Sequence, residues 1–275
     1  MTLQVLVAAM HQTDHSLLEK MNIQSDAMVG NQCDRNEIES FEWNGHQISY
    51  YSLAERGVGL NRNTLLMRAS ADIILFADSD VTYMEGYEKI ILSAYERFAD
   101  ADLILFNLRE SRGDEPFHDI VTSTGRAGRG IVSKFGAVSI SAKTESIRRA
   151  GISFSLLFGG GARYSCGEDT IFLQDCLKKG LRVYTCTDTI GTVKNEDSTW
   201  FNGYHEKYFV DKGGLFAYMY PRLGRCLAIY HILKHRKEYS SFGVMPAMKC
   251  ALRGVAEQRN KKTASAGGKW TGDTK

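Results

Sequence analysis

Long apolar runs, paired cysteines and an excess of one charge are all missing from this sequence of 275 residues. No stretch of about 18 apolar residues occurs, so we expect no membrane-spanning helix. We expect no secretory leader, because polar residues follow the apolar opening from His11 onward. The six cysteines show no C-x-x-C or metal-finger spacing, and a formal net charge of +2 gives no chain-wide attraction to nucleic acid. These absences together favour a reduced, soluble, cytoplasmic protein.

Composition and patterning indicate an α/β protein. Hydrophobic residues make up 43% of the chain and charged residues 24%, as in ordinary globular proteins. Short apolar runs alternate with segments of helical periodicity, an order that predicts helices packed on a mixed, mostly parallel sheet. We expect strands at 3–9, 26–30, 48–53, 73–77, 103–108, 135–141 and 181–186. We expect helices at 64–70, 85–98, 144–150 and 168–179, and a loop at 110–130.

The most informative stretch is the apolar run 73–77, which ends in Asp78-Ser79-Asp80. In an extended chain the side chains at i and i+2 point the same way, so the two aspartates would face one spot. That spot would lie at the carboxyl end of a strand, where open α/β sheets bind ligands. Two close carboxylates repel each other unless a cation lies between them, and hard oxygen ligands suit Mg²⁺ or Mn²⁺. A cation there would neutralise a diphosphate; alternatively, a polar turn simply ends the strand.

A second acidic pair, Glu168-Asp169, follows a glycine-rich loop. A helix N-terminus favours the charged form of a carboxyl, so we expect Asp169 to stay ionised and able to accept a proton. Helix capping alone would also explain the pair. Arg62, at the start of an expected helix, offers forked donors for a diphosphate. Two acid pairs with different neighbours indicate a division of labour, in which one pair binds a metal and the other acts as a general base.

The composition becomes basic from Pro221 onward. Between residues 221 and 262 ten lysines and arginines face only two glutamates. Five residues of the first part recur at helical spacing: Leu223, Cys226, Leu227, Tyr230 and Leu233. The pattern predicts a basic amphipathic helix, which either docks on an anionic membrane surface or packs its apolar stripe on the domain. Residues 263–275 are rich in glycine and lysine and are expected to be disordered.

Two of these motifs resemble the conserved blocks of family-2 glycosyltransferases. The pattern R-N-x(5)-A-x-A-D-I-x-x-F-x-D-S-D, which begins at Arg62, is similar to their R-N…F-x-D-x-D core. Gly167-Glu168-Asp169 resembles their downstream G-E-D block, and the order and spacing of the blocks fit. The resemblance covers roughly residues 3–200. It implies a GT-A fold with a C-terminal helical extension.

The resemblance also implies an activity. Such an enzyme is an inverting, metal-dependent hexosyltransferase that uses Mn²⁺ or Mg²⁺ and a nucleotide-diphosphate sugar, with UDP as the expected nucleotide. The acceptor would be a hydroxyl of a glycan or lipid-linked molecule in cell-surface polysaccharide synthesis. We therefore expect a cytoplasmic protein, peripheral on the inner face of the cell membrane, with no nucleic-acid partner.

Roles for individual residues follow from the resemblance. Asp80 would coordinate the metal, and Asp78 would contact the ribose or the metal. Arg62 would contact the diphosphate. Asp169 would deprotonate the acceptor hydroxyl, and Glu168 would position either the acceptor or Asp169. Gly160 and Gly161 would border the acceptor.

The sequence departs from the family pattern in several places. The usual V-P-T-Y-N opening appears as V-A-A-M-H, which puts Ala9 and His11 beside the nucleotide. Asn31 stands where an acidic cluster is usual and could still bond the edge of a pyrimidine base. Ser79, the middle residue of the D-x-D motif, is also expected to contact the nucleotide-sugar. Asn195 is nearest to the position at which many relatives have a histidine ligand. Trp200 and His205 are candidates for the acceptor site, but a buried tryptophan and a surface histidine explain them better.

These observations define the expected domains. We expect a glycosyltransferase domain at 1–220, with a nucleotide-sugar half at 1–110 and an acceptor half at 111–220. A basic helical extension at 221–262 and the tail at 263–275 would follow.

The sequence D-S-D-V-T also matches haloacid-dehalogenase-type phosphohydrolases, in which Asp78 would be a nucleophile and Asp80 an acid or base. A third alternative is a non-catalytic protein that binds nucleotide-sugars or partner enzymes.

Overall fold

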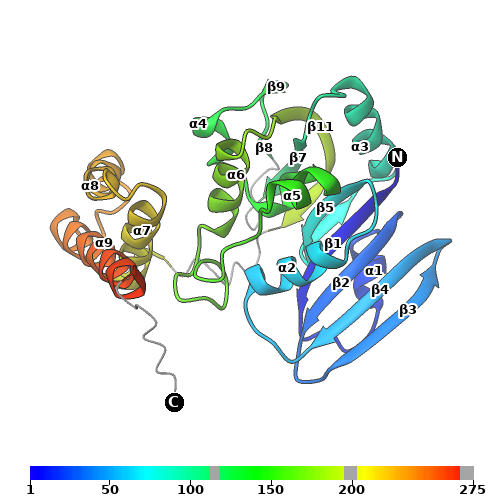
Figure 1. Ribbon diagram of the computed structural model, residues 1–275, viewed down its shortest axis with the longest axis horizontal. Helices are drawn as coiled ribbons and strands as arrows, with labels where there is room; N and C mark the ends of the chain where they lie inside the picture. The colour runs from blue at the N-terminus through cyan, green and yellow to red at the C-terminus, as the bar shows by residue number, and fades with distance from the viewer. Residues whose placement is uncertain (112–117, 195–202, 267–275) are drawn as a thin grey trace, which may run out of the picture. The chain divides into compact units, whose positions relative to one another are not determined.

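The computed structural model describes residues 1–111, 118–194 and 203–266 (Figure 1). The chain forms two compact units. The first comprises Met1–Ala162 and Glu168–Asp197, and the second comprises Arg163–Gly167 and Ser198–Lys275. The short segment Arg163–Gly167 thus packs with the second unit, although the chain on either side of it belongs to the first. The functional parts expected at 1–110, 111–220, 221–262 and 263–275 remain predictions.

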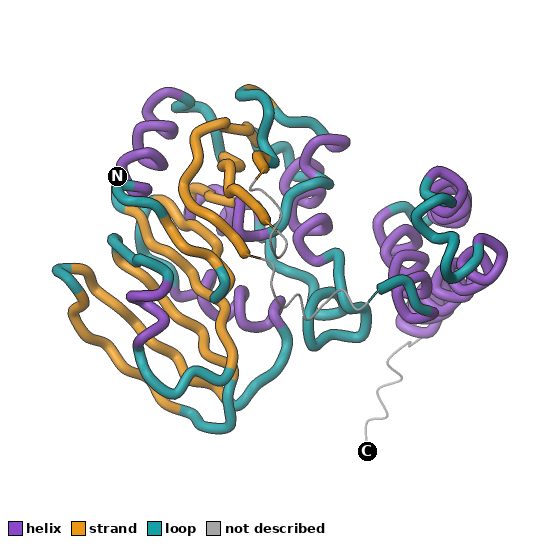
Figure 2. Tube along the Cα trace, turned by 180° about the vertical axis from the view of Figure 1, so that it is seen from behind, coloured by secondary structure: helices purple, strands orange, loops and turns teal. Residues whose placement is uncertain are grey.

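The first unit is built on one mixed sheet, in which β4, β2, β1 and β5 are parallel neighbours and β10 runs antiparallel to β5. Figure 2 shows the strands of this sheet in orange, with helices in purple. The order of the main path is β3-β4-β2-β1-β5-β10-β7-β11-β6. The strands are β1 (Leu3–Met10), β2 (Asp26–Gln32), β3 (Glu37–Trp43), β4 (His46–Leu53), β5 (Ile73–Asp78), β6 (Val81–Tyr83), β7 (Leu103–Ser111), β8 (His118–Asp119), β9 (Gly125–Arg126), β10 (Ile140–Lys143) and β11 (Val183–Lys194).

Helices cover both faces of this sheet, because its central strands are apolar on both sides. In β5 the odd residues pack in one core with helices α1 and α3, and the even residues pack in a second core with α2, α5 and α6. The helices of the first unit are α1 (Ser16–Lys20), α2 (Val58–Arg68), α3 (Tyr87–Arg97), α4 (Arg129–Val132), the 3₁₀ turn η1 (Ala137–Ser139), α5 (Thr144–Ala150) and α6 (Glu168–Lys178). The prediction of an α/β sandwich is confirmed.

Several boundaries differ from the sequence prediction. Strand β3 was not predicted; it is an antiparallel edge strand, and its alternate residues Ile38, Ser40 and Glu42 form an exposed face. Helix α2 begins at Val58, six residues before the expected start, because the Gly57 turn, with φ of 117°, already ends the preceding loop. The strand expected at 135–141 begins only at Ile140, after the turn η1. Strand β11 extends to Lys194 through register shifts near Thr189.

The second unit contains three helices in its described part: α7 (Glu206–Met219), α8 (Gly224–Lys234) and α9 (Val244–Ala266). Glycines let α7 and α9 approach closely, since a Cβ at Gly213 would overlap the Ala251 backbone and one at Gly254 would overlap that of Val210. The core between them consists largely of aromatic and small side chains, and Phe209, Tyr239 and Ala247 are buried in it. No helix among the described residues is long and apolar enough to cross a membrane.

Helix α8 does not use the apolar stripe that the sequence pattern marks as its packing face. It packs through Gly224, Ala228 and Ile232, which are buried. Leu223 and Tyr230 of the expected stripe are each 60% exposed. Within the second unit these residues therefore do not form the packing face of α8.

Candidate active site

The D-x-D motif lies where the sequence predicts it, at the carboxyl end of a central strand. Residues 73–77 are completely buried, and Asp78 is the last residue of β5, paired with Ala8 of β1. Ser79 and Asp80 form the turn before β6. The apolar strand thus places both carboxyl groups at one edge of the sheet.

Arg62 joins the two acidic pairs of the sequence. Its side chain is 3% exposed, and its Nη2 donates to both oxygens of Asp78, at 2.7 and 3.1 Å. Its Nη1 donates to Oδ1 of Asp169 at 2.9 Å and to Oε1 of Glu168 at 3.2 Å. All four residues belong to the first unit. One guanidinium therefore gathers three carboxylates from β5 and from the start of α6.

Aromatic side chains and Asn63 hold the guanidinium in place. Arg62 lies over the ring of Phe154, 5.3 Å from its centroid, and that ring stacks on Phe172 at 4.3 Å. Phe76 packs edge-on against both rings. Asn63 donates to the carbonyl of Phe154 and accepts from its N–H, at 2.9 and 2.8 Å. In the adjacent R-N pair, Arg62 therefore binds the acidic side chains and Asn63 fixes the ring of Phe154 beneath the guanidinium.

The charges in this cluster do not balance, because one guanidinium faces three carboxyl groups. Burial lowers the pKa of Arg62, but the charges of Asp78, Asp169 and Glu168 outweigh burial and raise it above the ordinary arginine value. Burial and the charge of Glu168 raise the pKa of Asp169, and Arg62 only partly opposes this. The expectation that the helix N-terminus keeps Asp169 strongly ionised is therefore wrong in direction: dehydration and the neighbouring carboxylate dominate.

Asp80 lies beside this cluster and forms no ion pair among the described residues. Burial of the carboxyl and the charge of Asp78 raise its pKa to about 6, with a smaller contribution from Glu110, although the charge of Lys20 slightly lowers it. The described residues contain no group of three His, Cys, Asp or Glu side chains that could hold a metal. Mg²⁺ and Mn²⁺ commonly bind through one or two carboxylates and complete their shells with substrate phosphates. Asp80, with Asp78 beside it, fits that limited role, while Asn195 lies outside the described residues.

The residues expected to face the nucleotide lie at the ends of β1 and β2. Ala9 is buried, whereas His11 is exposed and has a left-handed backbone, with φ of 55°. Asn31 is fully buried: its amide accepts from the Gln12 N–H and donates to the Gln12 carbonyl, both at 2.9 Å, and also donates to Ser52. In this structure Asn31 therefore ties two strand ends together, and contact with a base remains a prediction.

The glycine loop is anchored against both α2 and the acids. The carbonyl of Gly160 accepts from the Val58 N–H at 2.9 Å. Gly159 has φ of 106°, and a Cβ there would lie 2.8 Å from Cδ of Glu168. Gly161, with φ of 78°, approaches the backbone of Gly57. The loop thus borders the acidic cluster, and its expected contact with an acceptor stays a prediction.

Sequence reasoning missed the residues on the far side of Asp169. The N–H of Ala137 donates to its carboxyl, and a Cβ at Gly136 would lie 3.6 Å from its Oδ2. The sequence gives no signal for this contact, because Gly136 and Ala137 lie in a turn that is read as part of a strand. His205 is the N-cap of α7 in the second unit, where its ring accepts from the Tyr208 N–H at 3.4 Å. Trp200 lies outside the described residues.

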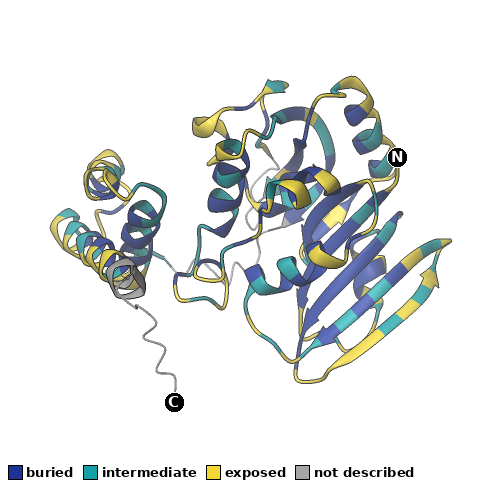
Figure 3. Cartoon of the chain, in the orientation of Figure 1, coloured by how far each residue is buried: buried dark blue, intermediate teal, exposed yellow. Residues whose placement is uncertain are grey.

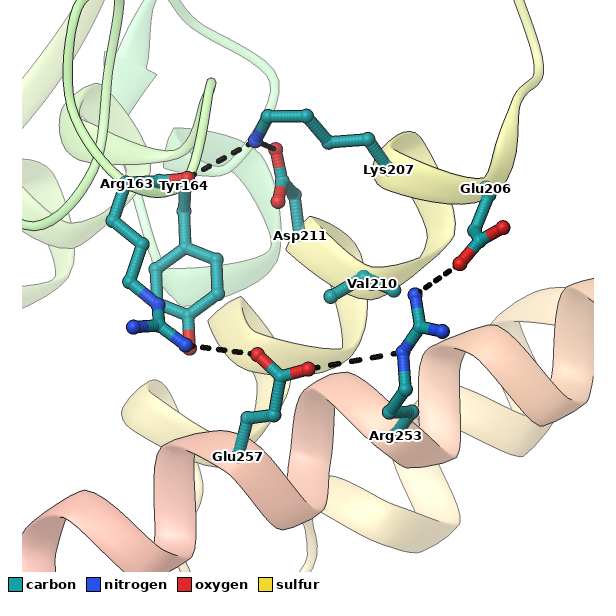
Figure 4. A pocket seen from close by; sticks show the side chains of 8 residues that line it. All are labelled: Arg163, Tyr164, Glu206, Lys207, Val210, Asp211, Arg253 and Glu257. Atoms are coloured by element: carbon teal, nitrogen blue, oxygen red, sulfur yellow. Dashed lines mark hydrogen bonds and ion pairs between the residues drawn. The ribbon is translucent and has the colours of Figure 1, made fainter.

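A separate pocket of about 320 Å³ lies within the second unit (Figure 4). Ion pairs line it: Lys207 with Asp211 at 2.6 Å, Arg163 with Glu257 at 2.9 Å, and Arg253 with Glu206 at 2.5 Å. The lining charges therefore satisfy one another. Asp211, which is buried, also accepts from the N–H and Oγ of Ser165, so it fixes the segment Arg163–Gly167 on α7.

Comparison with solved structures identifies the fold. S. aureus TarS 1-349 in complex with UDP aligns with 100% of this chain and 94% of its own, at 13% identity and a TM-score of 0.61. The complex of the same protein with UDP-GlcNAc aligns with 98% of this chain and 77% of its own, at 15% identity and a TM-score of 0.57. The chain has the GT-A fold. At these identities the similarity establishes the architecture alone.

The GT-A assignment confirms the fold that the motifs imply. The mannosyltransferase PcManGT from Pyrobaculum calidifontis, in complex with GDP-Man and Mn²⁺, aligns with 96% of this chain and 76% of its own, at 14% identity. Its TM-score of 0.47 is too low to add to the argument. No protein-family model matches the sequence, and no curated protein matches it significantly.

Proposed function

We propose that this GT-A protein is a glycosyltransferase of hexosyltransferase type. It moves a sugar from a nucleotide-diphosphate donor to a hydroxyl of a glycan or lipid-linked acceptor. The observation that carries the proposal is the four-residue cluster, in which Arg62 brings Asp78 of the D-x-D motif together with Glu168 and Asp169. Sequence blocks about 90 residues apart meet at one sheet edge. A transferase needs this arrangement, because the sugar donor must be held while the acceptor hydroxyl is deprotonated.

Asp169 is the residue suited to accept the proton of the acceptor hydroxyl. Its side chain is 23% exposed, so it can be reached, while Arg62 and the Ala137 N–H fix its orientation. A raised pKa makes it a stronger base than an ordinary aspartate, and catalytic efficiency is greatest when the pKa of the base lies near the working pH. A single positioned base matches direct displacement of the nucleoside diphosphate, with inversion at the sugar carbon.

The donor side of the site is formed by Asp78, Ser79 and Asp80. When bound there, Mg²⁺ or Mn²⁺ would offset the charge that develops on the leaving diphosphate. Asp78 is already oriented by both of its bonds to Arg62, and Asp80 remains available as a ligand. A contact of Arg62 with the diphosphate would require the guanidinium to give up one of these carboxylates, so we assign it primarily to positioning the acids.

The proposal extends to the nucleotide of the donor. UDP is the first nucleotide to test, because the TarS structures with this fold contain UDP and UDP-GlcNAc. A role in cell-surface polysaccharide synthesis at the cytoplasmic face of the membrane follows from the sequence resemblance to family 2.

The phosphohydrolase alternative does not fit the geometry. It needs a carboxylate oxygen of Asp78 free to attack phosphorus, but both oxygens accept hydrogen bonds from Arg62. A non-catalytic binding protein would not need a positioned base near Asp78. The intact cluster of Arg62, Glu168 and Asp169 therefore favours the enzyme.

A donor-turnover screen tests the proposal. The protein is incubated with UDP-, GDP-, CDP-, dTDP- and ADP-sugars, each with Mn²⁺, Mg²⁺ or EDTA, and the release of nucleoside diphosphate is measured. Metal-dependent release from one donor class is expected, since water replaces the acceptor slowly in many transferases. Hydrolysis of an aryl phosphate without donor turnover would support the phosphohydrolase, and donor binding without turnover would support the non-catalytic protein.

A further inference from the structure

Helix α8 presents an apolar stripe to solvent. Leu223 and Tyr230 are each 60% exposed, and Leu233 is 45% exposed. Their spacing of seven and three residues places them on one side of the helix, opposite the buried packing face described above. Figure 3 shows the exposed and buried sides of this helix. Large apolar side chains gathered on one exposed face mark an interaction surface.

Positive charge is concentrated in the segment that carries this stripe. The segment 221–237 contains five lysines and arginines and no aspartate or glutamate: Arg222, Arg225, Lys234, Arg236 and Lys237. All five are exposed. Within the described part of the chain none of them forms an ion pair, whereas most of the charges lining the nearby pocket are paired. Their charges are therefore available to an external partner.

We propose that this basic apolar face, formed by Leu223, Tyr230 and Leu233 with the five cations of the same segment, docks on an anionic lipid bilayer. Apolar side chains can enter the boundary between headgroups and acyl chains while long basic side chains stay at the headgroups. The short helix lies in the plane of the surface, in agreement with the lack of a spanning helix among the described residues. The proposal concerns the second unit and does not depend on the proposed transferase activity.

Charge distinguishes this partner from two others. A second copy of the chain docked through the same face would bring ten unpaired cations together, and their repulsion opposes such a dimer. Nucleic acid would attract the cations but offers no apolar layer for Leu223, Tyr230 and Leu233 to enter. An anionic bilayer satisfies both the charges and the stripe.

Vesicle co-sedimentation of the full chain tests the proposal. Vesicles of phosphatidylcholine alone are compared with vesicles containing about 30% phosphatidylglycerol, at 0.1 M and 0.5 M NaCl. We expect binding to the anionic vesicles at low salt, strong weakening at high salt, and little binding to the neutral vesicles. Absence of binding to anionic vesicles at low salt would overturn the proposal.

Variants at exposed positions distinguish binding through this face from nonspecific adsorption to the vesicles. Arg222→Gln/Arg225→Gln should weaken binding about 25-fold, since each basic residue near an anionic surface contributes about fivefold. Tyr230→Ser/Leu233→Ser should weaken it roughly tenfold or more. The matched controls are two variants at exposed positions of the first unit, Lys89→Gln/Arg149→Gln for charge and Met67→Ser for apolar exposure; these should bind like the wild type.

Two results would overturn the assignment to this face. The first is binding that the α8 variants leave unchanged. The second is concentration-dependent self-association of the wild type, in analytical ultracentrifugation without lipid, that Tyr230→Ser/Leu233→Ser abolishes; that result would make the face a contact between copies. Unfolding temperatures of all variants should match that of the wild type, because the replaced side chains are exposed.

Discussion

Nη1 of Arg62 donates to Oδ1 of Asp169 at 2.9 Å, across 107 residues of sequence. The same guanidinium holds Asp78 through its other nitrogen. Asp78, Glu168 and Asp169 are therefore all oriented by one buried cation. Because the guanidinium donates directly to Asp78 and to Asp169, a change at Arg62 affects both the donor side and the base.

Replacing Arg62 should damage stability and activity together. Arg62→Met leaves Asp78, Glu168 and Asp169 without their shared cation, and removing one partner of a buried charge cluster typically costs about 3–5 kcal/mol. We expect urea unfolding to show a loss of that size and donor turnover to be undetectable. Arg68→Met, at an exposed position of the same helix, is the matched control and should lie within about 0.5 kcal/mol of the wild type. Equal stability of the two variants would contradict the role given to Arg62.

Asp169→Asn should remove activity without removing stability. As the general base, Asp169 contributes roughly 10²–10⁴ to turnover, so donor turnover should fall by that factor while UDP binding persists. In the wild type kcat/KM should fall on the acid side at a higher pH than for an ordinary aspartate, because the base must be ionised and its pKa is raised. Loss of UDP binding in Asp169→Asn would contradict the assignment.

The stability difference between Asp169→Asn and the wild type should change with pH in a defined direction. The native pKa of Asp169 is above that of the unfolded chain, so between these two values the native state binds more protons and wild-type stability falls as pH rises. Above this window the ionised carboxylate is unfavourable, whereas the uncharged amide is not affected. Urea unfolding should therefore show Asp169→Asn to be at least as stable as the wild type at pH 7.5, with a smaller difference at pH 5. A large loss of stability at pH 7.5 would show that the carboxylate is structural.

Metal affinity should depend on pH through Asp80. Its pKa of about 6 in the absence of a cation means that the carboxyl is protonated below that pH and cannot serve as a ligand. In the presence of UDP, Mn²⁺ affinity should fall by about tenfold per pH unit below pH 6. Titration calorimetry at pH 7.5, 6.5 and 5.5 measures this. Asp80→Asn should bind weakly at every pH, and a wild-type affinity that does not change with pH would remove Asp80 from the metal site.

Two adjacent glycines give a paired test of the loop beside Glu168. Gly159→Ala places a Cβ 2.8 Å from both Glu168 and Val58 in a left-handed backbone, so Glu168 must shift and donor turnover should fall by at least about tenfold. At Gly160 a Cβ meets nothing within 4 Å, and Gly160→Ala should leave donor hydrolysis unchanged. Equal activity of the two variants would show that the loop does not position Glu168.

Much of the first unit follows from sequence pattern. Apolar runs locate the central strands, since those strands are buried on both faces, and the D-x-D motif lies at a strand end because the run before it is wholly apolar. The sequence cannot show that Arg62 binds carboxylates, because its partners come from distant segments. It also cannot show the Ala137 contact, which a turn makes, nor which face of α8 packs, because small residues form that face while larger ones remain exposed.

The measurement that tests the central claim most directly is calorimetric titration of UDP with Mn²⁺ into three proteins: the wild type, Asp80→Ala and Asp169→Asn. The account predicts metal-dependent binding to the wild type and to Asp169→Asn, and loss of that binding in Asp80→Ala. Binding that Asp80→Ala leaves unchanged, or the absence of wild-type binding to UDP and to the other nucleoside diphosphates, would contradict a donor site at Asp78 and Asp80.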